Sequence, residues 1–299
     1  MELAVHLREN IYEIQDFSIQ NSLHACFRYF SNNTLSILNN KISSLGRVYI
    51  GDEFCFNRLP NTHYIDNILN FIHKENIGLS FLTPILSDLN LNTLSSNLDY
   101  LYKYNPDTEI VINDWGLLFF LKENYPSFNL ALGRLLDKGF KDPRLKSLDY
   151  DLPDEIYNLL NSSTFDDPSF QYFVSSLGVN RLESDIFPYK DHLISSNLNL
   201  NISIYFPFTY ITSGRNCLLS LNDANPKEYF VPIYRCSQPC KQFSINLFHN
   251  SFAFPVFQYG NTIFFKLNDA LLSNLFSLAE QYNLRLVYQG LAYENNGSS

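Results

Sequence analysis

Apolar runs that suit buried strands alternate with amphipathic segments along most of the chain. The predicted strands cover residues 3–7, 48–50, 77–82, 110–112, 130–132, 179–183 and 202–206. Apolar residues at helical spacing occur between them, around Leu35 to Leu45, Ile65 to Ile72 and Leu94 to Leu101, and further helices are predicted at residues 115–124, 153–161 and 167–177. Such alternation favours repeated βαβ units and a parallel sheet. We therefore predict an α/β fold with a barrel-like parallel sheet of the TIM type, complete or distorted.

The C-terminal part has a different pattern. Residues 243–248, 253–258 and 261–266 predict three strands joined by short turns, which suits an antiparallel arrangement. A helix at residues 268–282 and a last strand at residues 284–289 are predicted to follow. The chain has no linker or internal repeat, so we expect one domain over residues 1–293, with residues 243–289 as a C-terminal elaboration. Residues 294–299 are expected to form a disordered tail.

Charge and cysteine content narrow the classes of function. The formal net charge of −9 disfavours a protein that follows a nucleic acid backbone with a basic face. The first residues are charged where a signal peptide would be apolar, and no apolar stretch approaches the ~18 residues of a membrane span. We therefore expect a cytoplasmic protein without a membrane span. In that reducing compartment, 5 cysteines in 299 residues favour metal binding or catalysis over disulfide bonds.

Four of the five cysteines form a dispersed pattern that indicates a metal site. Cys236 and Cys240 are close together, Cys217 precedes them, and Cys55 lies far upstream. Cys55 and Cys217 each follow a predicted strand, and the C-terminal ends of parallel barrel strands lie on one face. Thiolates select zinc, copper(I) or iron–sulfur clusters, and structural zinc sites usually use two close cysteine pairs. Dispersed ligands favour an iron–sulfur cluster, with zinc and unligated thiols as the alternatives.

Basic residues accompany these four cysteines. Arg58, Arg215, Arg235 and Lys241 each lie within three residues of one of them. A cluster held by four thiolates is negatively charged, and nearby cations stabilise it. The alternative is that these residues are ordinary surface charges. Cys26 has no partner in the pattern, and we expect it to be a buried structural thiol.

The sequence around the cysteines resembles a known family. Ser-Gly-Arg-Asn-Cys-Leu-Leu-Ser at residues 213–220, followed by Cys-Ser-Gln-Pro-Cys-Lys at residues 236–241, looks like the cysteine region of the collagenase-like peptidase (U32-type) family. That family often reads Ser-Gly-Arg-Cys-Leu-Leu-Ser and then Cys-x3-Cys-Arg. This chain departs from the family by the extra Asn216, and it lacks the cysteine that many members carry just before the Ser-Gly-Arg block.

The fourth cysteine indicates one branch of that family. Tyr-Ile-Gly-Asp-Glu-Phe-Cys-Phe-Asn-Arg at residues 49–58 is similar to a block of the UbiU/UbiV branch, closest to its UbiV-like iron–sulfur proteins. Residues 109–116 resemble a family strand that ends in Asn-Asp-x-Gly, and residues 178–183 resemble a Gly-Val-x-Arg-x-Glu block. The resemblance therefore extends along nearly the whole chain.

This resemblance implies a function as well as a fold. It implies a 4Fe–4S cluster bound by Cys55, Cys217, Cys236 and Cys240. It also implies oxygen-independent hydroxylation, as in ubiquinone biosynthesis, or a related redox modification of a small-molecule substrate, and a heterodimer with a homologous family subunit. The alternatives are a non-catalytic iron–sulfur subunit, and a peptidase-like or tRNA-modifying member. The acidic charge disfavours tRNA, and no Ser/His/Asp set or His-Glu-x-x-His motif supports peptide hydrolysis.

Polar residues at predicted strand ends supply the candidate catalytic groups, because barrel active sites collect there. Asp114, Arg181 and Glu183 are these candidates. Asp114 has the alternative role of capping the helix that follows it. Alternation places Arg181, Glu183 and Asp185 on one face of a strand, where they form a polar cavity lining or a solvated edge. Burial of all three is not expected, because buried charges need partners.

Other polar residues have simpler expected roles. Arg134 is expected to bind a carboxylate bidentately, and Arg144 is expected in a loop ion pair. Asp52 and Glu53 follow a strand beside Cys55, and either is a candidate acid or base, although we expect both to be exposed.

Overall fold

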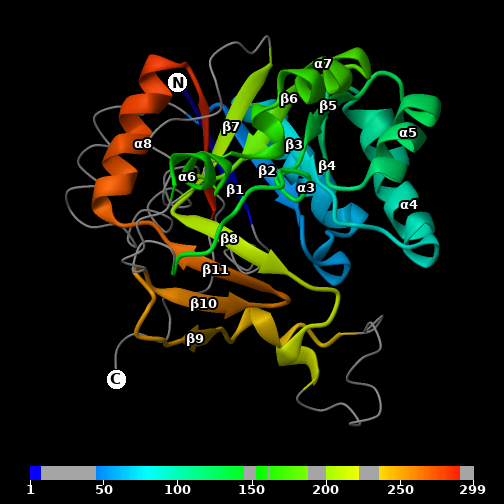
Figure 1. Cartoon of the computed structure of the whole chain (residues 1–299). Helices are drawn as coiled ribbons and strands as arrows, with labels where there is room; N and C mark the ends of the chain where they lie inside the picture. Colours follow the sequence, from blue (N-terminus) through cyan, green and yellow to red (C-terminus); the bar gives the residue numbers. More distant parts are fainter. Residues whose placement is uncertain (8–44, 145–152, 161, 188–199, 222–235, 290–299) are drawn as a thin grey trace.

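Eight parallel strands close into a barrel in the computed structural model of the chain (Figure 1). The structure describes residues 1–7, 45–144, 153–160, 162–187, 200–221 and 236–289. Around the barrel, the strands are β1 (Glu2–His6), β2 (Arg47–Gly51), β3 (Gly78–Leu82), β4 (Glu109–Ile112), β5 (Asn129–Leu132), β6 (Val179–Ser184), β7 (Asn201–Phe206) and β12 (Arg285–Gln289). The predicted α/β class and TIM-type parallel barrel are confirmed.

Helices cover the outside of the barrel. They are α3 (Thr62–Glu75), α4 (Asp88–Tyr104), α5 (Trp115–Asn124), α6 (Asp154–Leu160), α7 (Pro168–Ser176) and α8 (Asp269–Gln281). In α3 the four apolar residues at helical spacing, from Ile65 to Ile72, are the buried ones, and the Asn61 side chain caps its first turn. No helix in the described ranges is both long enough and apolar enough to cross a bilayer. The helix predicted from Leu35, and the predictions for Cys26, Arg235 and residues 294–299, lie outside these ranges.

A second, antiparallel sheet lies beyond one end of the barrel (Figure 1). Its strands, in spatial order, are β8 (Phe208–Ser213), β11 (Thr262–Lys266), β10 (Val256–Tyr259) and β9 (Ile245–Leu247). The sequence did not predict β8, which follows β7 after a single proline, Pro207. The range expected as an elaboration, residues 243–289, therefore combines two parts. Its first half joins β8 in the antiparallel sheet, while α8 and β12 complete the barrel, because β12 pairs with both β1 and β7.

The interior of the barrel has an apolar layer and, below it, a charged one. The apolar layer consists of residues from seven strands: Ala4, Tyr49, Leu82, Val111, Ala131, Tyr205 and Val287. The charged layer lies at the N-terminal ends of the strands. Arg285, the first residue of β12, contacts the Glu109 carboxylate at 2.5 Å and the Glu2 carboxylate at 2.7 Å. Arg181 Nε lies 3.3 Å from the second oxygen of Glu109, so this layer is internally paired.

The charged layer is expected to be sensitive to loss of one partner. Arg285→Met leaves the buried Glu109 carboxylate without its closest cation, and breaking a buried pair in this way costs about 3–5 kcal/mol. The exposed pair of Arg144 and Asp142 offers a matched control, because Arg144→Met should lower the stability far less than Arg285→Met. Urea unfolding of both variants and the wild type measures the two losses. Equal losses would contradict the importance of the charged layer.

Candidate functional site

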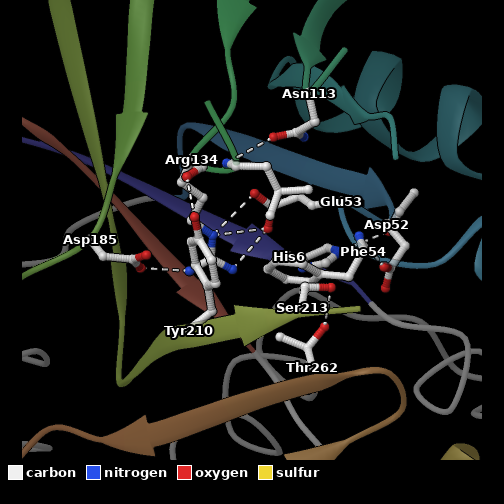
Figure 2. A network of polar contacts seen from close by, with 12 residues as sticks. His6, Asp52, Glu53, Phe54, Asn113, Arg134, Asp185, Tyr210, Ser213 and Thr262 are labelled. Atoms are coloured by element: carbon white, nitrogen blue, oxygen red, sulfur yellow. Dashed lines mark hydrogen bonds and ion pairs between the residues drawn. The ribbon is translucent and has the colours of Figure 1, made fainter. Parts of the chain in front are cut away.

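Arg134 lies at the centre of a buried polar network at the C-terminal end of the barrel (Figure 2). It follows β5, and its side chain is completely buried. Nε and Nη2 donate to the Glu53 carboxylate at 3.1 and 2.8 Å, and Nη1 donates to Asp185 Oδ1 at 2.7 Å. The guanidinium carbon also lies 3.8 Å from the centre of the Tyr205 ring. The expected bidentate pairing of Arg134 is confirmed, and it joins segments at the ends of four strands.

The acids beside Cys55 are buried, so the prediction that Asp52 and Glu53 are exposed was wrong. Their exposed fractions are 2% and 1%. Each carboxylate pairs with an arginine, and the local sequence does not reveal which arginine that is. Glu53 pairs with Arg134, and Asp52 Oδ1 accepts from Arg58 Nη2 at 2.9 Å. Burial raises the pKa of Glu53, and Arg134 opposes that rise.

The loop that carries Cys55 begins with a turn that requires glycine. Gly51 ends β2 with φ of 91°, and a Cβ atom there would lie 2.3 Å from the carbonyl oxygen of Leu82 on β3. The chain then turns so that Asp52 Oδ1 accepts from the backbone N–H groups of Phe54 and Cys55, both at 2.8 Å. The position of Cys55 is therefore set by Gly51 and by the buried Asp52 side chain.

Two amide side chains tie the cysteine-bearing segments together. Asn261 Nδ2 donates to the carbonyl oxygens of Phe54, at 2.7 Å, and Gly214, at 2.6 Å, which lie next to the loop of Cys55 and just before Cys217. Gln238 Nε2 donates to the carbonyl oxygen of Asn57, which links the segment between Cys236 and Cys240 to the same loop. Three stretches of chain far apart in sequence therefore meet at this place.

Further contacts link the segments that carry the four cysteines. Cys217 directly precedes the short helix η5 (Leu218–Leu221), which contacts η7 (Pro239–Lys241), where Cys240 lies. Arg58 Nη1, three residues after Cys55, lies 4.0 Å from Cys240 Sγ. Cys240 is buried, and Cys55, Cys217 and Cys236 are partly buried thiols. These contacts bring the cysteine-bearing segments together, and the role of the four thiols as ligands stays a prediction.

The four thiols are of the ligand type that an iron–sulfur cluster takes. No three His, Cys, Asp or Glu side chains lie close enough to hold one ion in the part of the chain that the structure describes. A single zinc ion needs four ligands within ~2.3 Å of one point, whereas a cubane spreads its ligands because each thiolate binds a different iron. Burial raises the pKa of the Cys55 thiol to about 11, and the nearby Arg58 opposes that rise. The thiols of Cys55 and Cys240 lie beside the buried cation of Arg58, and a cation there suits a negatively charged cubane.

A second group of charges extends the Arg134 network. Lys141 Nζ lies 3.1 Å from Asp185 Oδ2 and 3.8 Å from the centre of the Tyr210 ring. The Asp137 carboxylate is also buried and accepts from Ser184 Oγ at 2.6 Å. Burial raises the pKa of Asp137, and Lys141 opposes that rise. Two cations and three carboxylates are therefore packed together below the surface at this end of the barrel.

A cleft of about 750 Å³ opens beside these groups at the same end of the barrel. Segments after β2, β3 and β5 line it, together with β8 and the residues that follow β8. Glu53, Cys55, Asp137, Lys141 and Tyr210 all contribute to its walls. Apolar walls come from side chains such as Leu86, Phe140 and Leu159. A cleft of this size, with apolar walls and a few converging polar groups, is typical of a small-molecule site.

The three predicted catalytic residues lie outside this cleft. Asp114 caps α5, accepting from the N–H groups of Gly116 at 2.8 Å and Leu117 at 3.2 Å. Arg181 and Glu183 point into the barrel, in the charged layer and just above it. Glu183 and Asp185 are buried, with exposed fractions of 0% and 2%. Arg181 is half-buried, so the expectation that the three would not all be buried is confirmed, while partners from other strands compensate the two buried carboxylates.

The residues that sequence reasoning missed are those whose partners are distant in sequence. Asp137, Lys141 and Tyr210 line the cleft, but none of them lies in a motif or beside a cysteine. Their only sequence signal is that Asp137 and Lys141 follow a predicted barrel strand, as active-site residues in barrels do. Arg144 behaves as expected, in an exposed ion pair with Asp142, and Trp115 packs against Phe170 and Phe173.

Comparisons with known proteins found one distant structural similarity and no similar sequence. No family model matches the chain, and no curated protein matches it. A solved structure described as that of the U32 peptidase Mk0906 has a TM-score of 0.37 and 11% sequence identity, over 69% of each chain. A likeness at this level carries no conclusion about activity, and the barrel rests on the strand pairing described above.

Glu183 predicts a pH dependence of stability. Burial, and next the charge of Glu109, raise the pKa of Glu183 from 4.5 to about 7, so the folded protein holds a proton that the unfolded chain has released. Stability should therefore fall as the pH rises from about 4.5 to 7, and Glu183→Gln should remove this fall, a difference of up to about 3 kcal/mol. The glutamine in that variant is a neutral side chain of the same shape, which can still accept from the Tyr49 hydroxyl.

Urea unfolding at several pH values between 5 and 8 measures this difference. Glu123→Gln, at an exposed position on α5, is the control and should follow the wild type at every pH. Parallel stability curves for Glu183→Gln and the wild type would contradict the prediction.

Proposed function

We propose that the chain binds a 4Fe–4S cluster through Cys55, Cys217, Cys236 and Cys240 and takes part in oxygen-independent hydroxylation of a small molecule. This is the role implied by its resemblance to the UbiU/UbiV branch of the U32-type family. The proposal includes a reducing, cytoplasmic setting, in which thiols stay available as ligands. It also includes a homologous family subunit as the partner in a heterodimer.

The observation that carries this proposal is the convergence of the cysteine-bearing segments. Asn261 and Gln238 join the segments that carry all four thiols, and Arg58 lies between Cys55 and Cys240. The arrangement combines two features, a buried guanidinium and four cysteine-bearing segments that meet beside it. A negatively charged cluster gives both features one purpose.

The position of the cleft favours a reactive cluster over a structural one. Cys55 lines the cleft directly, together with Glu53 and Lys141. A bound cluster would supply a one-electron couple at this wall. The apolar side chains of the cleft would hold the body of a small molecule and exclude water, while its polar groups orient the molecule.

A non-catalytic iron–sulfur subunit is the second candidate. Four cysteine ligands complete the coordination of a cubane and leave no iron open to a substrate. In that case the cluster would fasten the antiparallel sheet to the barrel, and the chemistry would belong to the partner. A cluster that undergoes no reversible reduction would favour this second candidate.

Anaerobic purification with iron and sulfide analysis tests the cluster. The wild type should contain about four iron and four sulfide ions per chain, with visible absorption that bleaches on reduction. Cys217→Ser and Cys236→Ser should lose the iron, because each removes one ligand. Cys26→Ser is the matched control and should keep it, since Cys26 is outside the predicted ligand set. One zinc ion per chain in place of iron would overturn the proposal.

A further inference from the structure

Arg58 is a buried cation between two of the proposed cluster ligands. It lies in the short helix η2 (Phe56–Arg58) that follows Cys55, and its exposed fraction is 8%. Nη2 and Nε each lie 2.9 Å from an oxygen of Asp52, and Nη1 lies 4.0 Å from Cys240 Sγ. The guanidinium carbon is 4.9 Å from the centre of the Tyr259 ring. The side chain therefore contacts the barrel loop, the turn of Cys240 and the antiparallel sheet at once.

The fork of Arg58 is held in place from both sides. Asp52 binds two of its nitrogens and also accepts from the N–H group of Cys55 at 2.8 Å, so the carboxylate orients the thiol and the cation together. On the other side, the backbone of the turn after β10 lies close, and a Cβ atom at Gly260 would be 3.1 Å from Nη1. This confinement leaves Nη1 directed at Cys240.

A cation placed in this way has a defined effect on a cluster. Hydrogen bonds to the sulfurs, net charge and burial set the reduction potential of an iron–sulfur centre, and groups around the ligands also control how firmly the metal is held. A buried positive charge stabilises the reduced state, which carries one more electron, and so raises the potential. Arg58 supplies the charge, and its Nη1–H group reaches the sulfur of Cys240.

We propose that Arg58 is a positioning residue that holds the Cys55 loop against the Cys240 turn and raises the reduction potential of the cluster between them. This inference rests on the proposed function for the existence of the cluster. It goes further because it assigns two properties to one side chain outside the four ligands. These are the rate at which the cluster loses iron and the reduction potential of the cluster.

Two substitutions separate the charge of Arg58 from its shape. Arg58→Gln removes the charge, and Arg58→Lys keeps it while losing the fork that Asp52 holds. Iron should be released to a chelator about 10-fold faster from both variants. The midpoint potential, from a spectroscopic redox titration, should become more negative in Arg58→Gln and stay near the wild-type value in Arg58→Lys. Arg144→Gln, in an exposed ion pair, is the control and should change neither quantity.

A readout without iron covers the case in which Arg58→Gln retains no cluster. Hydrogen exchange of the iron-free protein should be faster in residues 236–243 of both Arg58 variants than in the wild type, because the contact of the guanidinium with Cys240 is lost. The midpoint potential of the cluster in Arg58→Lys then tests the effect of the charge, because this variant keeps the positive charge. Unchanged iron release and exchange in Arg58→Gln, or equal shifts of potential in the Gln and Lys variants, would overturn the inference. A wild type that binds no iron would instead overturn the proposed function, and this inference with it.

Discussion

The ion pairs of Arg134 are the interaction on which the C-terminal end of this barrel depends. A completely buried guanidinium is bound by Glu53 from the segment after β2 and by Asp185 from the segment after β6, and the Tyr210 hydroxyl of β8 donates to the Arg134 carbonyl oxygen at 2.6 Å. Burial opposes the charged form, but the two carboxylates outweigh it and raise the pKa of Arg134. A buried charge is tolerated only when its partners are held in place. The loops at this end of the barrel are therefore fixed in their relative positions.

The cysteine site depends on the same ion pairs through two adjacent acids. Glu53 faces the barrel and pairs with Arg134, whereas Asp52 pairs with Arg58 on the side of Cys240. The two residues before Phe54 thus connect the barrel network to the thiols. Loss of either pairing would free the segment that carries Cys55. One short segment, residues 51–55, therefore takes part both in the buried charges of the barrel and in the cysteine site. The positive φ of Gly51 gives this segment its direction.

The sequence was sufficient for the barrel but not for its interior. The seven strands from β1 to β7 were predicted because buried parallel strands form apolar runs, which are a local property. The role of β12 as the strand that closes the barrel depends on pairing with β1 and β7, which no local pattern encodes. The strand β8 was missed because only Pro207 separates it from β7, which left no turn signal in the sequence between the two strands. Alternation correctly put Arg181, Glu183 and Asp185 on one face, but the burial of Glu183 and Asp185 depends on Tyr49 and Arg134, which come from other strands.

The buried charges at the two ends of the barrel differ in their surroundings, and this difference bears on where the proposed reaction takes place. At the N-terminal ends, Arg285 and Arg181 enclose the Glu109 carboxylate, and the layer is closed by side chains of the strands themselves. The apolar layer with Tyr49 and Tyr205 separates it from the other end. At the C-terminal ends, Glu53, Asp137 and Lys141 border a cleft and lie beside Cys55. Charges that are paired among themselves serve the fold, whereas charges that also border an open cleft are available to a ligand. The proposed reaction therefore belongs at the end of the barrel where the cysteine-bearing segments, the buried charges and the cleft meet.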